Sequence, residues 1–170
     1  MSNFNVEKID NILNNFLKEF GASAQLSNEF QCQARKNKII YYTLYVEEDE
    51  HGWFETSLSR IDPDIICDPF LSSFFHELGH IMTANNFTDD DWDNYFDDVY
   101  DIEDNIYEGI TEEECKELNF RYFDLPMEKA ATEWACKYMR ENADKVAELW
   151  AELKPAIIEC YFNFELSIDS

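Results

Sequence analysis

The residues best suited to chemistry are two histidines four positions apart, with a glutamate directly after the first. They are His76, Glu77 and His80, in the stretch His-Glu-Leu-Gly-His, which is an H-E-x-x-H motif. Residues four apart share one face of a helix, so both imidazoles can reach a single ion. Imidazole suits zinc, and the intervening glutamate can take a proton from water that the ion activates. The motif therefore predicts a zinc site with Glu77 as its general base.

The residues around the motif predict a deeply packed helix that positions both histidines. Asp68 is a suitable N-cap for this helix, and Pro69 is a suitable first helical residue. A broad apolar face follows, made by Phe70, Leu71, Phe74, Phe75, Leu78, Ile81 and Met82. The alternative is a pair of core histidines that bind no ion, but two unpaired imidazoles on an apolar face would be a costly arrangement.

A catalytic zinc site usually has three protein ligands and one open position, so a third ligand must come from elsewhere. The H-E-x-x-H-x-x-G-x-x-H continuation is excluded, because Thr83 and Asn86 stand where the glycine and the third histidine would be. The remaining histidine, His51, lies in an acidic stretch and is better explained as a surface residue. A glutamate from a downstream helix is the better candidate, as in thermolysin-like sites.

The stretch Phe-His-Glu-Leu-Gly-His resembles the active-site helix of the ImmA/IrrE-type metallopeptidases. Their second signature reads approximately E-x-x-A-N-x-[FW]-A, and residues 128–135 read Glu-Lys-Ala-Ala-Thr-Glu-Trp-Ala, with Thr132 in place of asparagine. The resemblance implies that Glu128 is the third ligand, and Glu133, about one helical turn later, is the second choice. It covers roughly residues 1–150 in layout, although its specific residues are confined to these two motifs.

The resemblance also implies a zincin-like fold, one Zn²⁺ per chain and the activity of a cytoplasmic zinc endopeptidase from a bacterium or a phage. Some relatives cleave a repressor that is encoded beside them on a mobile element. A tyrosine or histidine often stabilises the oxyanion in such enzymes. The sequence offers five residues for this role: Tyr95, Tyr107, Tyr122, Tyr138 and His51.

The first half of the chain predicts an α+β arrangement. Residues 5–20 form an amphipathic helix that Gly21 ends. A small antiparallel sheet of about three strands is expected next, from residues 30–34, 39–46 and 53–58, and it packs on the motif helix.

The second half predicts a mainly helical structure. One helix is expected to begin at residues 88–91, and another at the capping box Thr111-Glu112-Glu113-Glu114. A long helix begins at Pro126 and is expected to reach about Leu153 before Pro155 breaks or kinks it. An apolar tail then packs back on the core. We expect a single zincin-like domain over residues 1–170, made of residues 1–87, an acidic helical insertion over 88–117, and the third-ligand helix with a C-terminal packing segment over 118–170.

The net charge of −24 limits the partners of this chain. A protein this acidic should repel nucleic acids and anionic membranes, and it should attract a basic protein such as a transcriptional regulator. The segment 88–117 alone holds 14 aspartates and glutamates against one lysine. This leaves two alternatives to a simple enzyme: a zinc-containing acidic protein that captures a basic partner or mimics nucleic acid without catalysis, and an enzyme whose acidic segment recruits a basic substrate.

Cysteine usage and the N-terminus favour the cytoplasm. The five cysteines are scattered and include no C-x-x-C pair, which argues against a disulfide framework or a thiolate zinc site. The first residues lack the basic and apolar regions of a signal peptide, and no apolar run approaches the roughly 20 residues of a membrane span.

Overall fold

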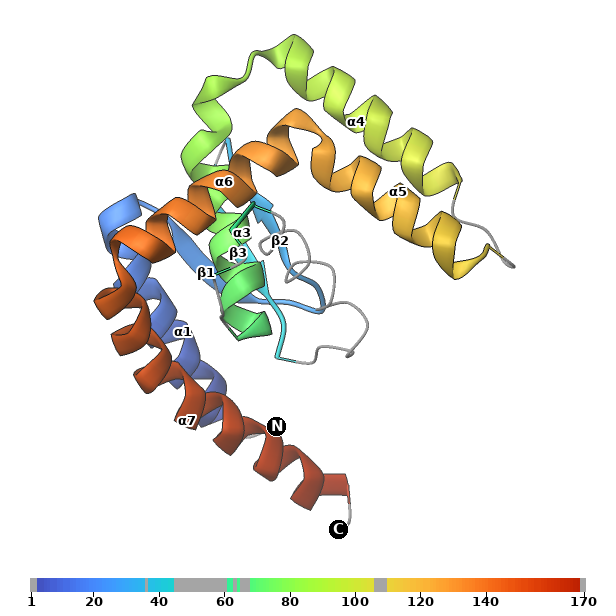
Figure 1. The fold of residues 1–170 in the computed structure, drawn as a ribbon. Helices are drawn as coiled ribbons and strands as arrows, with labels where there is room; N and C mark the ends of the chain where they lie inside the picture. Colours follow the sequence, from blue (N-terminus) through green and yellow to red (C-terminus); the bar gives the residue numbers. More distant parts are fainter. Residues whose placement is uncertain are drawn as a thin grey trace.

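A computed structural model of the chain describes residues 3–35, 37–44, 61, 62, 64, 68–105 and 110–168. Within these residues the fold is α+β, with a small sheet and several helices arranged around one buried helix (Figure 1). No described helix combines the length and apolar character that crossing a membrane requires.

The N-terminal helix agrees with its prediction. Helix α1 spans Asn3–Leu17, and the 3₁₀ helix η1 spans Lys18–Phe20. Gly21 then adopts a left-handed conformation with φ 61°, which ends the helix because glycine reaches this region without a Cβ clash. The inner face of α1 is fully buried through Ile9, Leu13 and Leu17.

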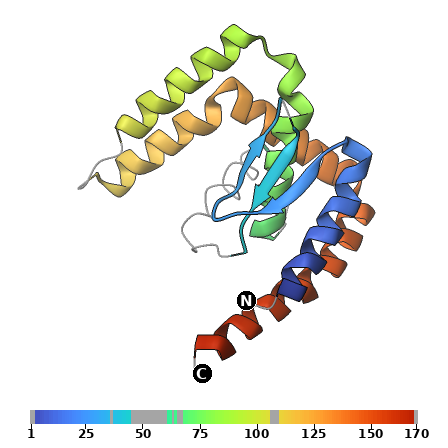
Figure 2. The ribbon, with the colours of Figure 1, turned by 180° about the vertical axis from the view of Figure 1, so that it is seen from behind.

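The sheet has three strands, β1 (Ser23–Leu26), β2 (Gln31–Gln33) and β3 (Ile39–Tyr42), in the order β1-β3-β2. Strand β3 pairs parallel with β1 and antiparallel with β2. The predicted antiparallel sheet is therefore wrong, and the sheet is mixed. The physical reason is the route of the chain: after β1 it crosses to the far edge, and the β2–β3 hairpin then returns β3 between the two other strands (Figure 2).

Strand β1 was not among the predicted strands, because its pairing depends on a contact from α1. The Asn14 side chain accepts a hydrogen bond from the Ala24 backbone nitrogen at 2.9 Å and donates one to the Ala24 carbonyl at 3.1 Å. Asn14 thus satisfies two backbone groups of β1 in the way a neighbouring strand would.

Two predicted strands are found in shortened form. Strand β2 lies inside the predicted segment 30–34, and β3 covers the first half of the predicted segment 39–46. The end of that segment and the third predicted strand, residues 53–58, lie outside the described residues.

The motif helix, α3, spans Pro69–Thr83 and is followed by the 3₁₀ helix η2, Ala84–Asn86. Its start is as predicted, because the Asp68 side chain accepts a hydrogen bond from the Phe70 backbone nitrogen and Pro69 occupies the first turn. Every residue from Phe70 to Ile81 is buried. The helix lies between the sheet and α6, so it has no face open to solvent along this stretch.

The acidic segment forms a helical hairpin. Helix α4 spans Asp89–Asp104 and helix α5 spans Glu112–Asp124, and they run side by side and project from the rest of the molecule (Figures 1 and 2). Thr88 caps α4 through a reciprocal pair of hydrogen bonds with Asp91. Thr111 and Glu114 form the predicted capping box of α5.

The predicted long helix is two helices. Helix α6 spans Pro126–Glu141, and α7 spans Ala143–Ile168. Asn142 separates them, and both its backbone and its side-chain nitrogens donate to the Tyr138 carbonyl, at 2.9 and 3.0 Å. Pro155 was predicted to break or kink this helix; it does not break it, because α7 continues through this residue and packs along α1 (Figure 1).

Candidate metal centre

The centre is built where α3 and α6 approach each other most closely. Gly79 makes this approach possible, because a Cβ at this position would lie 2.2 Å from the Ala131 carbonyl oxygen. No side chain fits in that space without moving one helix backbone. The close contact places the first turn of α6, with Glu128, against the histidine face of α3.

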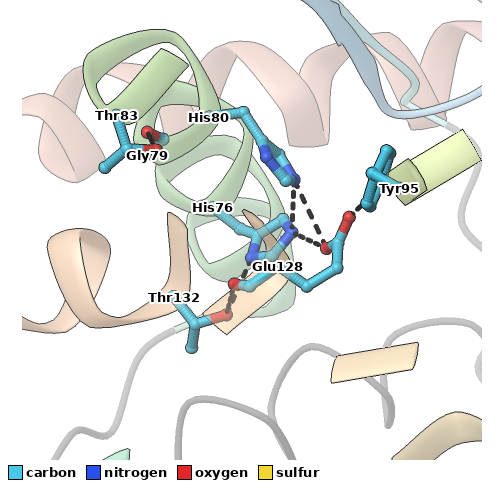
Figure 3. A network of polar contacts seen from close by, with 7 residues as sticks. All are labelled: His76, Gly79, His80, Thr83, Tyr95, Glu128 and Thr132. Atoms are coloured by element: carbon cyan, nitrogen blue, oxygen red, sulfur yellow. Dashed lines mark hydrogen bonds and ion pairs between the residues drawn. The ribbon is translucent and has the colours of Figure 1, made fainter. Parts of the chain in front are cut away.

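Three of the predicted residues converge on one point (Figure 3). His76 Nε2 lies 2.9 Å from Glu128 Oε2, and His80 Nε2 lies 3.3 Å from the same oxygen. The two imidazole Nε2 atoms are 3.1 Å apart. Glu128 is 0 % exposed, His76 is 1 % exposed and His80 is 9 % exposed. A carboxylate buried so completely is stable only beside cationic or hydrogen-bonding partners, which both imidazoles provide.

The spacing of these three atoms fits a metal ion. Ligand atoms about 2.1 Å from a tetrahedral zinc lie about 3.4 Å from one another. The observed separations of 2.9, 3.1 and 3.3 Å are slightly shorter, so an ion requires each side chain to move outward by only a few tenths of an ångström. The group can therefore hold a metal ion, and its donor set of two imidazoles and one carboxylate suits zinc among others.

Thr132 fixes the orientation of one ligand. Its hydroxyl donates to the Glu128 backbone carbonyl at 2.9 Å, which can only accept. The hydroxyl oxygen therefore accepts from His76 Nδ1, which lies 3.1 Å away. This hydrogen bond holds the ring so that Nε2 is the nitrogen that faces the centre, as is usual for metal-binding histidines.

Without a metal, the centre holds an ion pair. Burial lowers the pKa of His80, but the charge and hydrogen bond of Glu128 and the charge of Glu77 outweigh it and raise this pKa to about 9. Burial acts to raise the pKa of Glu128, and the two imidazoles reverse this and hold it well below its usual value. Glu128 is thus a carboxylate at neutral pH, and His80 carries a proton that a metal ion must displace.

One tyrosine of the acidic hairpin, Tyr95, reaches the carboxylate of Glu128, and a second, Tyr122, lies near it. The Tyr95 hydroxyl, from α4, donates to Glu128 Oε1, which is the oxygen that faces away from the histidines (Figure 3). Tyr122, from α5, lies close enough to Tyr95 for the two hydroxyls to interact. Burial, followed by the negative charge of Glu128, raises the pKa of both hydroxyls far above the usual value, so both stay protonated.

Glu77 lies on α3 beside the ligands and is 6 % exposed. The thiol of Cys32, from the edge strand β2, lies close enough to interact with it. Burial and then the charge of Glu77 raise the pKa of this thiol, so Cys32 stays protonated.

The other predicted residues lie elsewhere or outside the described residues. Glu133 is exposed on α6 and does not belong to the converging group, so the structure places Glu128 and not Glu133 at the centre. Tyr138 is hydrogen-bonded to Glu19 and stacks on Trp134, away from the histidines. His51 and Tyr107 lie outside the described residues.

Sequence reasoning missed the supporting contacts of Cys32, Gly79 and Thr132. Thr132 had a weak signal, because it occupies a defined position of the second motif. Cys32 had none, because it lies 45 positions before Glu77 and a strand residue does not reveal which helix covers it.

Comparisons of the chain with protein-family models, with curated proteins and with solved structures found no match.

Proposed function

We propose that this protein is a zinc-dependent endopeptidase. The observation that carries the proposal is the buried convergence of His76, His80 and Glu128, with Glu77 adjacent. Within the part of the chain that the structure describes, the group has three donors, which matches the ligand number of catalytic zinc sites and leaves a fourth position for water or substrate.

The chemistry divides between the ion and the chain. A zinc ion supplies Lewis acidity, which lowers the pKa of water and polarises a peptide carbonyl. Glu77 would remove a proton from the attacking water as the new C–O bond forms, and would deliver it to the leaving amine as the peptide C–N bond breaks in the following step. The protonated Cys32 thiol lies beside the Glu77 carboxylate and helps to orient it. Of the tyrosines predicted as oxyanion donors, Tyr95 lies beside the centre, but its one hydroxyl proton is donated to Glu128 Oε1 and is not available to an oxyanion.

The substrate we propose is a basic protein. The hairpin that reaches the centre carries most of the acidic side chains between residues 88 and 117, and those of Asp90, Asp93 and Asp97 are exposed. Such a surface attracts cationic segments and repels nucleic acid. A DNA-binding transcriptional regulator has suitable charge and agrees with the resemblance to the ImmA/IrrE-type peptidases.

A non-catalytic binding protein is the second candidate. It is favoured by Phe96 and Tyr100 on α4, which are 49 % and 63 % exposed among the aspartates. Exposed aromatic rings within an acidic helix suit capture of a basic partner, with the metal serving structure alone.

A cleavage assay with a peptide library separates the two candidates. The zinc-loaded protein is incubated with peptides prepared from a whole proteome, and new peptide ends are counted by mass spectrometry. If the protein is a peptidase, the parent should produce new peptide ends, and Glu77→Gln should produce none although its metal content is unchanged. Glu133→Gln alters an exposed glutamate of α6 and should cleave like the parent. Equal cleavage by Glu77→Gln would remove its assigned role, and no cleavage by the parent would favour the binding protein.

A further inference from the structure

The carboxylate of Glu128 has one oxygen, Oε2, that faces the two histidines and another, Oε1, that faces Tyr95. Oε2 faces both imidazoles, at 2.9 and 3.3 Å, whereas Oε1 receives the hydroxyl proton of Tyr95. Glu128 is 0 % exposed, so water cannot replace this hydrogen bond. A buried carboxylate oxygen without a hydrogen-bond partner is strongly unfavourable, so this contact has a clear physical reason.

The direction of the hydrogen bonds around Tyr95 follows from proton counting. A tyrosine hydroxyl has one proton, and that of Tyr95 is donated to a carboxylate that can only accept. Tyr122 interacts with Tyr95, and because the Tyr95 proton is already donated, any support from Tyr122 must use the proton of Tyr122. Each hairpin helix thus contributes one hydroxyl near Glu128.

We propose that Tyr95 is a positioning residue that holds Glu128 as a one-oxygen metal ligand, with Tyr122 supporting it. By occupying Oε1, Tyr95 keeps this oxygen from binding the ion and directs Oε2 alone toward it. A carboxylate that bound through both oxygens would fill the position that water or substrate needs. Partners of this kind orient metal ligands and typically change metal affinity by about 10- to 100-fold.

The acidic hairpin, made of α4 and α5, thereby has a structural role at the metal centre in addition to its exposed charge. Its two helices are part of the metal centre, because α4 supplies the hydroxyl that holds Glu128 and α5 supplies the hydroxyl beside it. The base of α4 is itself held against the sheet side of the molecule, since Arg35 pairs with Asp89 and lies over the Trp92 ring at 5.8 Å. The inference rests on the proposed metal site, and it adds residues that neither motif contains.

The test is metal affinity, measured by competition between the protein and a chromophoric chelator for Zn²⁺ and for Co²⁺. Tyr95→Phe removes only the hydroxyl, and we expect it to weaken binding about 10- to 100-fold. We also expect a changed Co²⁺ absorption spectrum, because Glu128 is free to bind through both oxygens. Tyr100→Phe is the matched control, because it removes the same atom from an exposed residue of the same helix, and it should leave both readouts unchanged.

If Tyr95→Phe fails to fold, Tyr122→Phe provides the test. The metal affinity of Tyr122→Phe should also fall below that of the parent, but by a smaller factor. Affinity within twofold of the parent in Tyr95→Phe, with an unaltered Co²⁺ spectrum, overturns the positioning role while the proposed peptidase stands. Weaker binding in Tyr95→Phe beside a parent that binds metal but cleaves nothing supports the positioning role and refutes the peptidase. A parent that binds neither ion refutes both.

Discussion

The buried centre and the acidic hairpin use charge in opposite ways. At the centre, a carboxylate and two imidazoles lie in the interior, and each is held by direct contacts with the others. On the hairpin, the acidic side chains that the structure describes are exposed, and their ion pairs, such as Arg121 with Asp101, face solvent. Interactions between charges are strong where water is excluded and weak where water and salt screen them. We infer that the few buried charges determine the chemistry of the centre, whereas the many exposed charges affect how the protein meets its partners.

The largest effect is expected from Gly79→Ala, which disrupts the close contact between α3 and α6 at the centre. A new Cβ would lie 2.2 Å from the Ala131 carbonyl oxygen, so the α3 and α6 backbones must separate. We expect a loss of about 2–3 kcal/mol in the free energy of unfolding, measured by urea denaturation, with loss of zinc binding.

Gly21→Ala is the control for this prediction. Nothing lies within 4 Å of a Cβ at Gly21, but its φ of 61° disfavours alanine. The expected loss is about 1 kcal/mol, with zinc binding intact. Equal losses for the two variants would show that backbone conformation, and not the approach of two helices, explains the effect at Gly79.

The second prediction concerns pH and separates the centre from the hairpin. His80 has a pKa raised to about 9, so it is protonated at pH 7 and must release one proton to bind metal. Apparent Zn²⁺ affinity should therefore rise about tenfold per pH unit between pH 6.5 and 8, measured by chelator competition with the chelator's own pH dependence subtracted.

The metal-free protein should show the opposite trend. A pKa raised in the folded state stabilises the fold fully below the unfolded value of about 6.5, and this contribution is lost as pH rises through about 9. Metal affinity independent of pH over this range would mean that His80 is neutral without metal, against the assigned ion pair.

The third prediction neutralises the hairpin with Asp90→Asn, Asp93→Asn and Asp97→Asn together. These side chains are exposed, so the free energy of unfolding should change by less than about 0.5 kcal/mol and zinc content should not change. Binding of a lysine-rich probe peptide at low salt should weaken about tenfold, since each exposed charge contributes up to about 0.5 kcal/mol.

The same binding experiment is repeated at several salt concentrations for the parent and the triple variant. Binding of the probe to the parent should weaken as salt rises, and the triple variant should depend on salt less steeply. Salt-independent binding by the parent would contradict a recruiting role for the hairpin.

The smallest effect is expected at the exposed pair of Arg121 and Asp101. The two atoms lie 3.0 Å apart, but the side chains are 51 % and 65 % exposed. Arg121→Gln should change the free energy of unfolding by less than about 0.5 kcal/mol in thermal or urea denaturation. A loss above about 1 kcal/mol would mean that this hairpin pair behaves as a buried one.

Local signals account for what the sequence predicted. Asp68 and Pro69 mark the start of α3, Thr111 and Glu114 mark the start of α5, and Gly21 ends the first helix, because caps act within one turn. The two motif histidines share a face by helical spacing alone. Glu128 required the resemblance, since nothing local relates it to His76.

Contacts between distant segments explain the failures. Strand β1 depends on the Asn14 side chain of another element, and the mixed sheet depends on where the β2–β3 hairpin is placed. Helix α6 ends at Asn142, where the sequence has no glycine or proline to indicate a helix end. The role of Tyr95 at the centre is visible only in the folded chain, where its hydroxyl meets Glu128, because one tyrosine among nine carries no signal of its partner.

The central claim is that His76, His80 and Glu128 together hold one ion, and metal content tests it most directly. The measurement is elemental analysis of protein purified without a metal-affinity tag, beside His76→Ala, Glu128→Ala and the control Glu133→Ala. We expect about one zinc per chain in the parent and in Glu133→Ala, and none in the other two. A parent without metal after zinc is added, or zinc retained in Glu128→Ala, would contradict the account.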